Sequence, residues 1–156
     1  MEQSVRHISD VVIKAIREQW VIAGHKLTNA FEESLRPEVT QDGADVTKIE
    51  IYGRAYGVYM SRGVKAENIR YPFAPARIKG IKSWVQMRLG IADEREASSM
   101  AYAIATTHGR EGMPIRDGQL GSRFLLKTKE RHQAEISKAV KKHFDLIIQK
   151  TIQHGT

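Results

Sequence analysis

Both ends of the chain carry apolar side chains three and four residues apart, the spacing that puts them on one face of an α-helix. Residues 4–36 are therefore predicted to form one long helix, capped by Ser4 or Ser9 and ended by Pro37, since the residue before a proline disfavours the helical region. Gly24 leaves open whether this segment is one helix or two. The same spacing returns over residues 128–153 and predicts a long C-terminal helix.

The only clear β signal lies between these helices. Residues 38–40 and 46–52 flank Asp42-Gly43, a pair that suits a tight turn. A two-stranded hairpin is marginally stable in water, so this one must pack on the helices or pair with strands of another copy. The fold class is therefore predicted to be α+β and mainly helical, with a long N-terminal helix, a small antiparallel hairpin or sheet and a C-terminal helix.

The middle of the chain predicts shorter helices. They are a short helix or turn over 53–63, a helix over 76–89 closed by Gly90, and a helix from Asp93 to about His108. Asp93 with Glu96 three residues later is typical of a capping box. Trp84 is expected to be buried against one of the two terminal helices, and Trp84→Ala is then expected to cost about 3–5 kcal/mol.

The length of 156 residues predicts a single domain, 1–156. Within it, residues 109–122 combine four glycines, one proline and both signs of charge, which predicts an extended loop or arm. Its apolar residues Met113, Ile115 and Leu120 are candidates for contacts with a neighbouring subunit. The arm is expected to be mobile in the free protein and ordered after assembly.

No pattern in the sequence indicates an enzyme. The chain has no cysteine, and its six histidines do not follow a metal-ligand spacing, so we expect no metal, cofactor or catalytic site. The carboxylates Asp93, Glu94 and Glu96 are explained by the preference of acids for a helix N-terminus. We also expect neither a secretory signal nor a membrane span, because no apolar segment is long enough.

The formal net charge of +7 favours contact with an acidic partner. Cationic residues gather between positions 54 and 88, among Tyr56, Tyr59, Tyr71, Phe73 and Trp84. The candidate basic interface or DNA-facing residues are Arg54, Arg62, Lys65, Arg77, Lys79, Lys82 and Arg88, with Arg70 in the same interval. Such a mixture can grip a nucleic-acid backbone, yet the same residue types are enriched at protein interfaces. We favour protein contact, and a basic nucleic-acid-binding module is the alternative.

The order of short motifs in the second half of the chain resembles a known family. The motifs are Tyr56-Gly-Val-Tyr59, Gly63, Pro72, Ile81-Lys-Ser-Trp84-Val85, Leu89-Gly90-Ile91, Glu96-Ala97, Ala101-Tyr-Ala-Ile-Ala105, Gly112 and Phe124. This order is similar to that of the neck and tail-completion proteins of tailed bacteriophages, over about residues 46–150. The family often has a Val-Glu-Phe-Gly-type run after the tyrosine, where this chain has Tyr59-Met60-Ser61-Arg62-Gly63.

The resemblance implies a non-enzymatic virion structural protein. It would be part of the head–tail connector, neck or tail-completion ring through which DNA passes, and it would be assembled in the host cytoplasm. The partners implied are further copies in a ring oligomer and neighbouring connector and tail proteins. Non-specific contact with DNA is implied as well, and no membrane.

Overall fold

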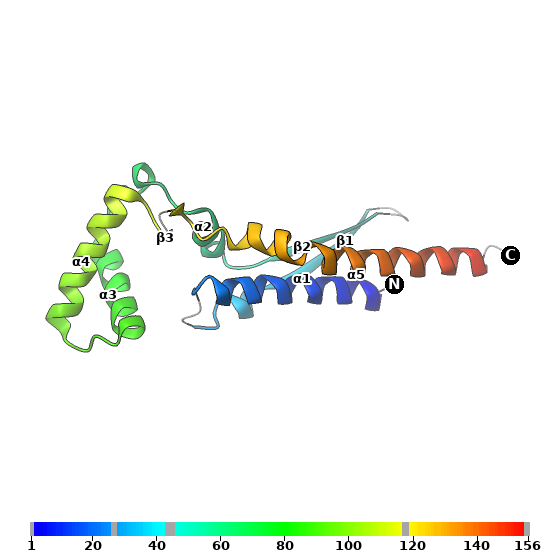
Figure 1. The fold of residues 1–156 in the computed structure, drawn as a ribbon, viewed down its shortest axis with the longest axis horizontal. Helices are drawn as coiled ribbons and strands as arrows, with labels where there is room; N and C mark the ends of the chain where they lie inside the picture. The colour runs from blue at the N-terminus through cyan, green and yellow to red at the C-terminus, as the bar shows by residue number, and fades with distance from the viewer. Residues whose placement is uncertain (1, 26–27, 43–45, 117–118, 155–156) are drawn as a thin grey trace. The chain divides into compact units, whose positions relative to one another are not determined.

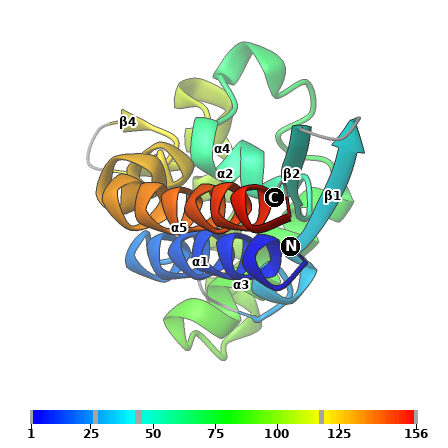
Figure 2. The same ribbon diagram turned by 90° about the vertical axis from the view of Figure 1, so that its right-hand side faces the viewer.

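The computed structural model describes residues 2–25, 28–42, 46–116 and 119–154 (Figures 1 and 2). The chain forms two compact units. The first combines Met1–Arg54 with Phe124–Thr156, and the second is the continuous segment Ala55–Arg123. The single domain expected from chain length stays a prediction.

Two long helices and a hairpin make up the first unit. Helices α1 (Glu2–Ile22) and α5 (Phe124–His154) lie side by side and run antiparallel, since Gln19 near the end of α1 meets His132 in the first half of α5 (Figure 2). The hairpin consists of β1 (Arg36–Asp42) and β2 (Val46–Tyr52), preceded by one 3₁₀ turn, η1 (Glu32–Ser34). The predicted α+β fold with long terminal helices is confirmed.

The N-terminal helix is shorter than predicted. It ends at Ile22 instead of continuing to residue 36, because Gly24 takes a φ of 71°, a left-handed conformation that closes a helix. The amides of Gly24 and His25 then donate to the carbonyls of Val21 and Trp20. Pro37 does not end this helix but lies within β1.

Three aromatic rings form a compact cluster in the first unit. Trp20, Phe31 and Phe124 are each at most 3% exposed. The rings of Trp20 and Phe31 stack with centroids 4.1 Å apart, and Phe124 meets Trp20 edge-on at 5.2 Å. Both geometries are favourable for aromatic pairs. The cluster joins α1, the segment before β1 and the first residue of α5.

The hairpin confirms both predicted strands. Its register runs from Arg36 opposite Tyr52 to Asp42 opposite Val46, so β1 extends beyond the predicted residues 38–40. The predicted turn residue Gly43 lies outside the described residues. β2 contacts α1, and its Ile49 and Ile51 are half-buried. Within the described ranges no third strand pairs with β1 or β2.

The second unit is built around two packed helices (Figure 1). Its elements are α2 (Tyr56–Arg62), η2 (Ala66–Asn68), α3 (Pro75–Leu89), α4 (Glu94–Glu111), β3 (Ile115–Arg116) and β4 (Gln119–Leu120). Ile78 of α3 packs against the fully buried Ala101 and Ala105 of α4, whose small side chains allow close approach. The predicted cap is confirmed, because the carboxylate of Asp93 accepts the amide of Glu96 at 2.7 Å.

Trp84 is not buried. Its side chain is 42% exposed, whereas its neighbour Val85 is completely covered. The helix α3 turns Ile78 and Val85 inward, and adjacent helical positions lie about 100° apart around the axis. This rotation carries Trp84 away from the buried face, so the predicted burial of Trp84 is wrong.

Residues 109–116 and 119–122 do not form one extended loop, and residues 117–118 of the predicted arm lie outside the described residues. The described ones comprise the last turn of α4, a short hairpin of β3 and β4, and a return towards α2. Met113 and Val64 exchange two backbone hydrogen bonds of 2.9 and 2.6 Å. The amides of Ser122 and Arg123 donate to the carbonyls of Met60 and Ser61 at 3.0 and 2.8 Å. In the described part of this segment, the amides of Gly112, Met113, Gly121 and Ser122 therefore bond within the second unit, which is not expected of a free arm.

Candidate assembly surfaces

The cations predicted as one basic face lie on several elements. Arg54 is the last residue of the first unit, Arg62 belongs to α2, and Lys65 follows it closely. The remaining predicted cations lie on α3: Arg77, Lys79, Lys82 and Arg88. Their environments differ from one residue to the next.

Lys82 is bound by an acid of the chain itself. Its ammonium group donates to the carboxylate of Glu94, which also accepts a 3.3 Å hydrogen bond from Gln86. Only 24% of the Lys82 side chain is exposed. The hydrogen bond and charge of Lys82 lower the pKa of Glu94. Lys82 therefore joins α3 to the start of α4 and is not an open cation.

Arg77 points into the second unit. Its Nη2 lies 3.3 Å from Nδ1 of His108 and 2.9 Å from the sulfur of Met113. Burial lowers the pKa of His108, and the charge of Arg77 lowers it further. Met113, predicted to contact a neighbouring subunit, is thus engaged within its own chain.

Arg62 and Lys65 line a shallow hollow in the second unit. Its volume is about 520 Å³, and Tyr59, Asn68 and Leu120 contribute to its wall. Leu120, the second predicted arm residue, therefore lies beside these cations. The third arm residue, Ile115, has a side chain outside what the structure describes. Among the predicted basic residues, Arg62 and Lys65 are brought together at this hollow.

An apolar groove crosses the first unit. It has a volume of about 280 Å³ and is lined by side chains of α1, β2 and α5: Ile8, Val12, Ile49, Ile51, Val140, His143, Phe144 and Ile147. His143 is 6% exposed, which confirms its predicted place in the core or at its rim, whereas Phe144 is 55% exposed. The apolar stripe of α5 signals this groove in the sequence, but only the fold shows that β2 completes it.

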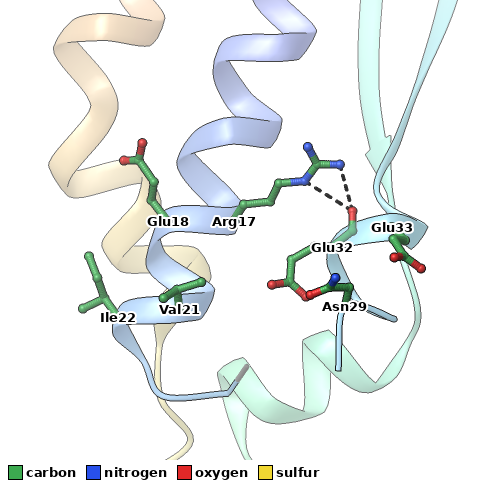
Figure 3. Close-up of a pocket in the computed structure, with 7 residues that line it drawn as sticks. All are labelled: Arg17, Glu18, Val21, Ile22, Asn29, Glu32 and Glu33. Atoms are coloured by element: carbon green, nitrogen blue, oxygen red, sulfur yellow. Dashed lines mark hydrogen bonds between the residues drawn. The ribbon is translucent and has the colours of Figure 1, made fainter. Parts of the chain in front are cut away.

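A second hollow of the first unit has mixed chemistry (Figure 3). The guanidinium of Arg17 donates from Nε and Nη2 to the carbonyl of Glu32 at 3.3 and 3.0 Å. Glu18, Val21, Ile22, Asn29 and Glu33 line the rest. The contact fastens α1 to η1 and leaves Val21 and Ile22 at the surface, where they are 47% and 55% exposed.

Over residues 2–25, 28–42, 46–116 and 119–154, no three His, Asp or Glu side chains are grouped so as to hold a metal ion. None of the helices, as far as they are described, is long and apolar enough to cross a membrane. Comparison of the chain with models of protein families, with curated proteins and with solved structures finds no match.

Proposed function

We propose that this chain is a non-enzymatic structural protein of a tailed bacteriophage. In this proposal it forms part of a ring at the head–tail junction or in the tail-completion complex. The observation that carries the proposal is the pairing of a two-stranded hairpin with an adjoining apolar groove in the first unit. Ile49 and Ile51 belong to both, because they lie on β2 and line the groove.

The hairpin has backbone groups available to a partner. In the described part of the chain, β1 and β2 pair only with each other, so each has an outer edge. An open edge invites another strand, and a hairpin gains stability when further strands or an apolar partner join it. A neighbouring copy that adds a strand or fills the groove supplies both kinds of contact.

Ring formation follows if the groove and its occupant are different surfaces of the same chain. Such head-to-tail contacts repeat from copy to copy, and they close when the rotation per subunit permits. The order of motifs resembling phage neck proteins supports this assignment. The net charge of +7 is compatible with non-specific attraction to DNA passing through a ring.

The proposal is tested by changing the groove without disturbing the core. Phe144→Glu places a charge on a half-exposed groove residue, and Leu126→Glu is a matched control on the same helix, with 40% exposure, outside the groove. We expect Phe144→Glu to abolish ring formation and incorporation into particles, whereas Leu126→Glu behaves as wild type. Light scattering gives the oligomer size, and electron microscopy locates the chain in the particle.

Two results contradict the proposal. One is a wild-type chain that stays monomeric and enters no particle. The other is tight binding to one preferred DNA sequence by the monomer, which favours the alternative of a nucleic-acid-binding module.

A further inference from the structure

Helix α3 carries exposed apolar side chains on a second face, opposite the face that packs against α4. Ile78 packs against α4 and Val85 is completely buried, while Trp84 and Met87 are 42% and 61% exposed. Helical spacing places them with three other residues on a surface that we name the outer face of α3: Ala76, Gly80, Ser83, Trp84 and Met87. A helix with apolar residues on both sides is typical of one covered on both sides.

We propose that the outer face of α3 binds an amphipathic helix of another protein, with acidic residues along both borders of its apolar stripe. Three observations support this proposal: a notch at Gly80, exposed anchors beside it, and the charge of α3. The face belongs to the second unit, so the proposal does not depend on the hairpin, the groove or ring formation.

Gly80 forms the notch. Glycine destabilises a helix interior relative to alanine, and a glycine there usually has a packing reason. A Cβ added at Gly80 would meet no atom of the described residues within 4 Å, so nothing in that part of the chain requires glycine. A missing side chain does allow a second helix to approach closely, and Trp84 one turn further stands beside the notch.

The exposed side chains favour a protein over a nucleic acid. Trp84 and Met87 are residue types enriched in the centre of protein interfaces. Lys82 is held by Glu94 and Arg77 lies near His108, so neither presents an open charge to a phosphate backbone.

Charge specifies the kind of helix that fits. Residues 75–89 contain four cations and no carboxylate. Lys79 and Arg88 lie on opposite borders of the outer face, about a quarter turn from its centre on each side. Acidic residues on the partner complement these borders, whereas a second copy of α3 would oppose like charges.

The test uses three fluorescein-labelled probes and the full chain. Two synthetic helical peptides share one apolar stripe and differ only in having Glu or Lys along both borders, and the third probe is a DNA duplex. Fluorescence anisotropy measures binding to the wild type and to three variants: Gly80→Gln, which fills the notch, Trp84→Ala, and the distant control Ile152→Ala. Ile152 is 67% exposed on α5.

We expect the Glu peptide to bind at least about tenfold more tightly than the Lys peptide, because only its charges complement the borders. Gly80→Gln and Trp84→Ala should each weaken it at least about tenfold, and Ile152→Ala should not. Circular dichroism checks that the variants remain folded. Light scattering on the same samples should show that Gly80→Gln leaves self-association unchanged, which separates this inference from ring formation.

Three outcomes overturn the inference. The first is that neither peptide binds. The second is that both peptides bind equally and Gly80→Gln has no effect on that binding. The third is that the duplex binds more tightly than the Glu peptide and Gly80→Gln leaves that binding intact, which assigns the face to nucleic acid.

Discussion

The guanidinium of Arg77 donates from Nη2 to Nδ1 of His108 across 3.3 Å. A guanidinium has no acceptor, so Nδ1 must accept and the imidazole must be neutral, with its proton on Nε2. Protonation of His108 removes this acceptor and places two cations side by side. The pKa of His108 is accordingly lowered, first by burial and then by Arg77.

This arrangement predicts that acid destabilises the second unit. Because the folded pKa of His108 lies below its ordinary value of 6.5, the unfolded chain binds the proton more readily. Stability should therefore fall as pH drops from above 6.5 through the lower folded pKa. His108→Gln, which cannot titrate, should lose this part of the pH dependence in thermal melts. Identical pH slopes for wild type and variant would contradict it. Glu94 acts in a separate window, since its lowered pKa affects stability only near and below 4.5.

The aromatic cluster should dominate the stability of the first unit. Phe124 is fully buried against Trp20 and Phe31, so Phe124→Ala should cost about 3–5 kcal/mol of unfolding free energy. Trp84→Ala, at a side chain 42% exposed, should cost about 1 kcal/mol or less. Urea denaturation measures both. Equal losses would show that Trp84 carries core packing after all.

Two glycines should respond to alanine in opposite directions. At Gly121, with φ of 76°, a Cβ would lie 2.5 Å from the backbone of Ser61 and Arg62, so Gly121→Ala should cost at least about 2 kcal/mol. Gly80→Ala has open space in a helix and should raise stability by up to about 1 kcal/mol. Thermal melts of the two variants provide the comparison, and a destabilising Gly80→Ala would mean that the position is covered.

The segment that looked like an arm should resist hydrogen exchange at particular amides. Its composition alone predicts fast exchange over Gly109–Ser122. The structure instead bonds the amides of Met113, Gly121 and Ser122 to carbonyls of Val64, Pro114 and Met60. We expect these three amides to exchange slowly in the free protein, as measured by NMR. Fast exchange at all three amides would support the mobile arm predicted from the sequence.

The cap of α4 provides a smaller and separable effect. Asp93→Ala removes the acceptor of the Glu96 amide and should destabilise the protein by about 1 kcal/mol. Asp93→Ser keeps an acceptor and is the matched control. Equal melting temperatures for the two variants would mean that the cap contributes nothing.

Local signals predicted the helices of the second unit well. Gly90 and Asp93 mark the end of α3 and the start of α4 within a residue or two, because caps act through the nearest backbone amides. The predicted end of α1 was wrong for a related reason. The apolar spacing continues past Gly24, and spacing does not report that this glycine adopts a positive φ.

The candidate surfaces were less predictable because they depend on distant partners. Lys82 and Arg77 look like open cations in the sequence, but Glu94 lies 12 positions from Lys82 and His108 lies 31 from Arg77. The groove needs three elements, and the alternation of Ile49 and Ile51 gives no indication of which helices will border them. Residue type and spacing predict which side chains are apolar or charged, whereas tertiary contacts decide which remain available.

The nested order of the two units has a consequence for synthesis on the ribosome. The second unit is continuous, and its beginning and end are hydrogen-bonded to each other through Met60, Ser61, Ser122 and Arg123. It can complete its contacts as soon as it emerges. The first unit must wait for α5, because Phe124 is translated only after the whole second unit. During that interval Trp20 and Phe31 lack their third ring, so the nascent chain holds an unfinished aromatic cluster until Phe124 emerges, and this is the interval in which a chaperone would have most to bind.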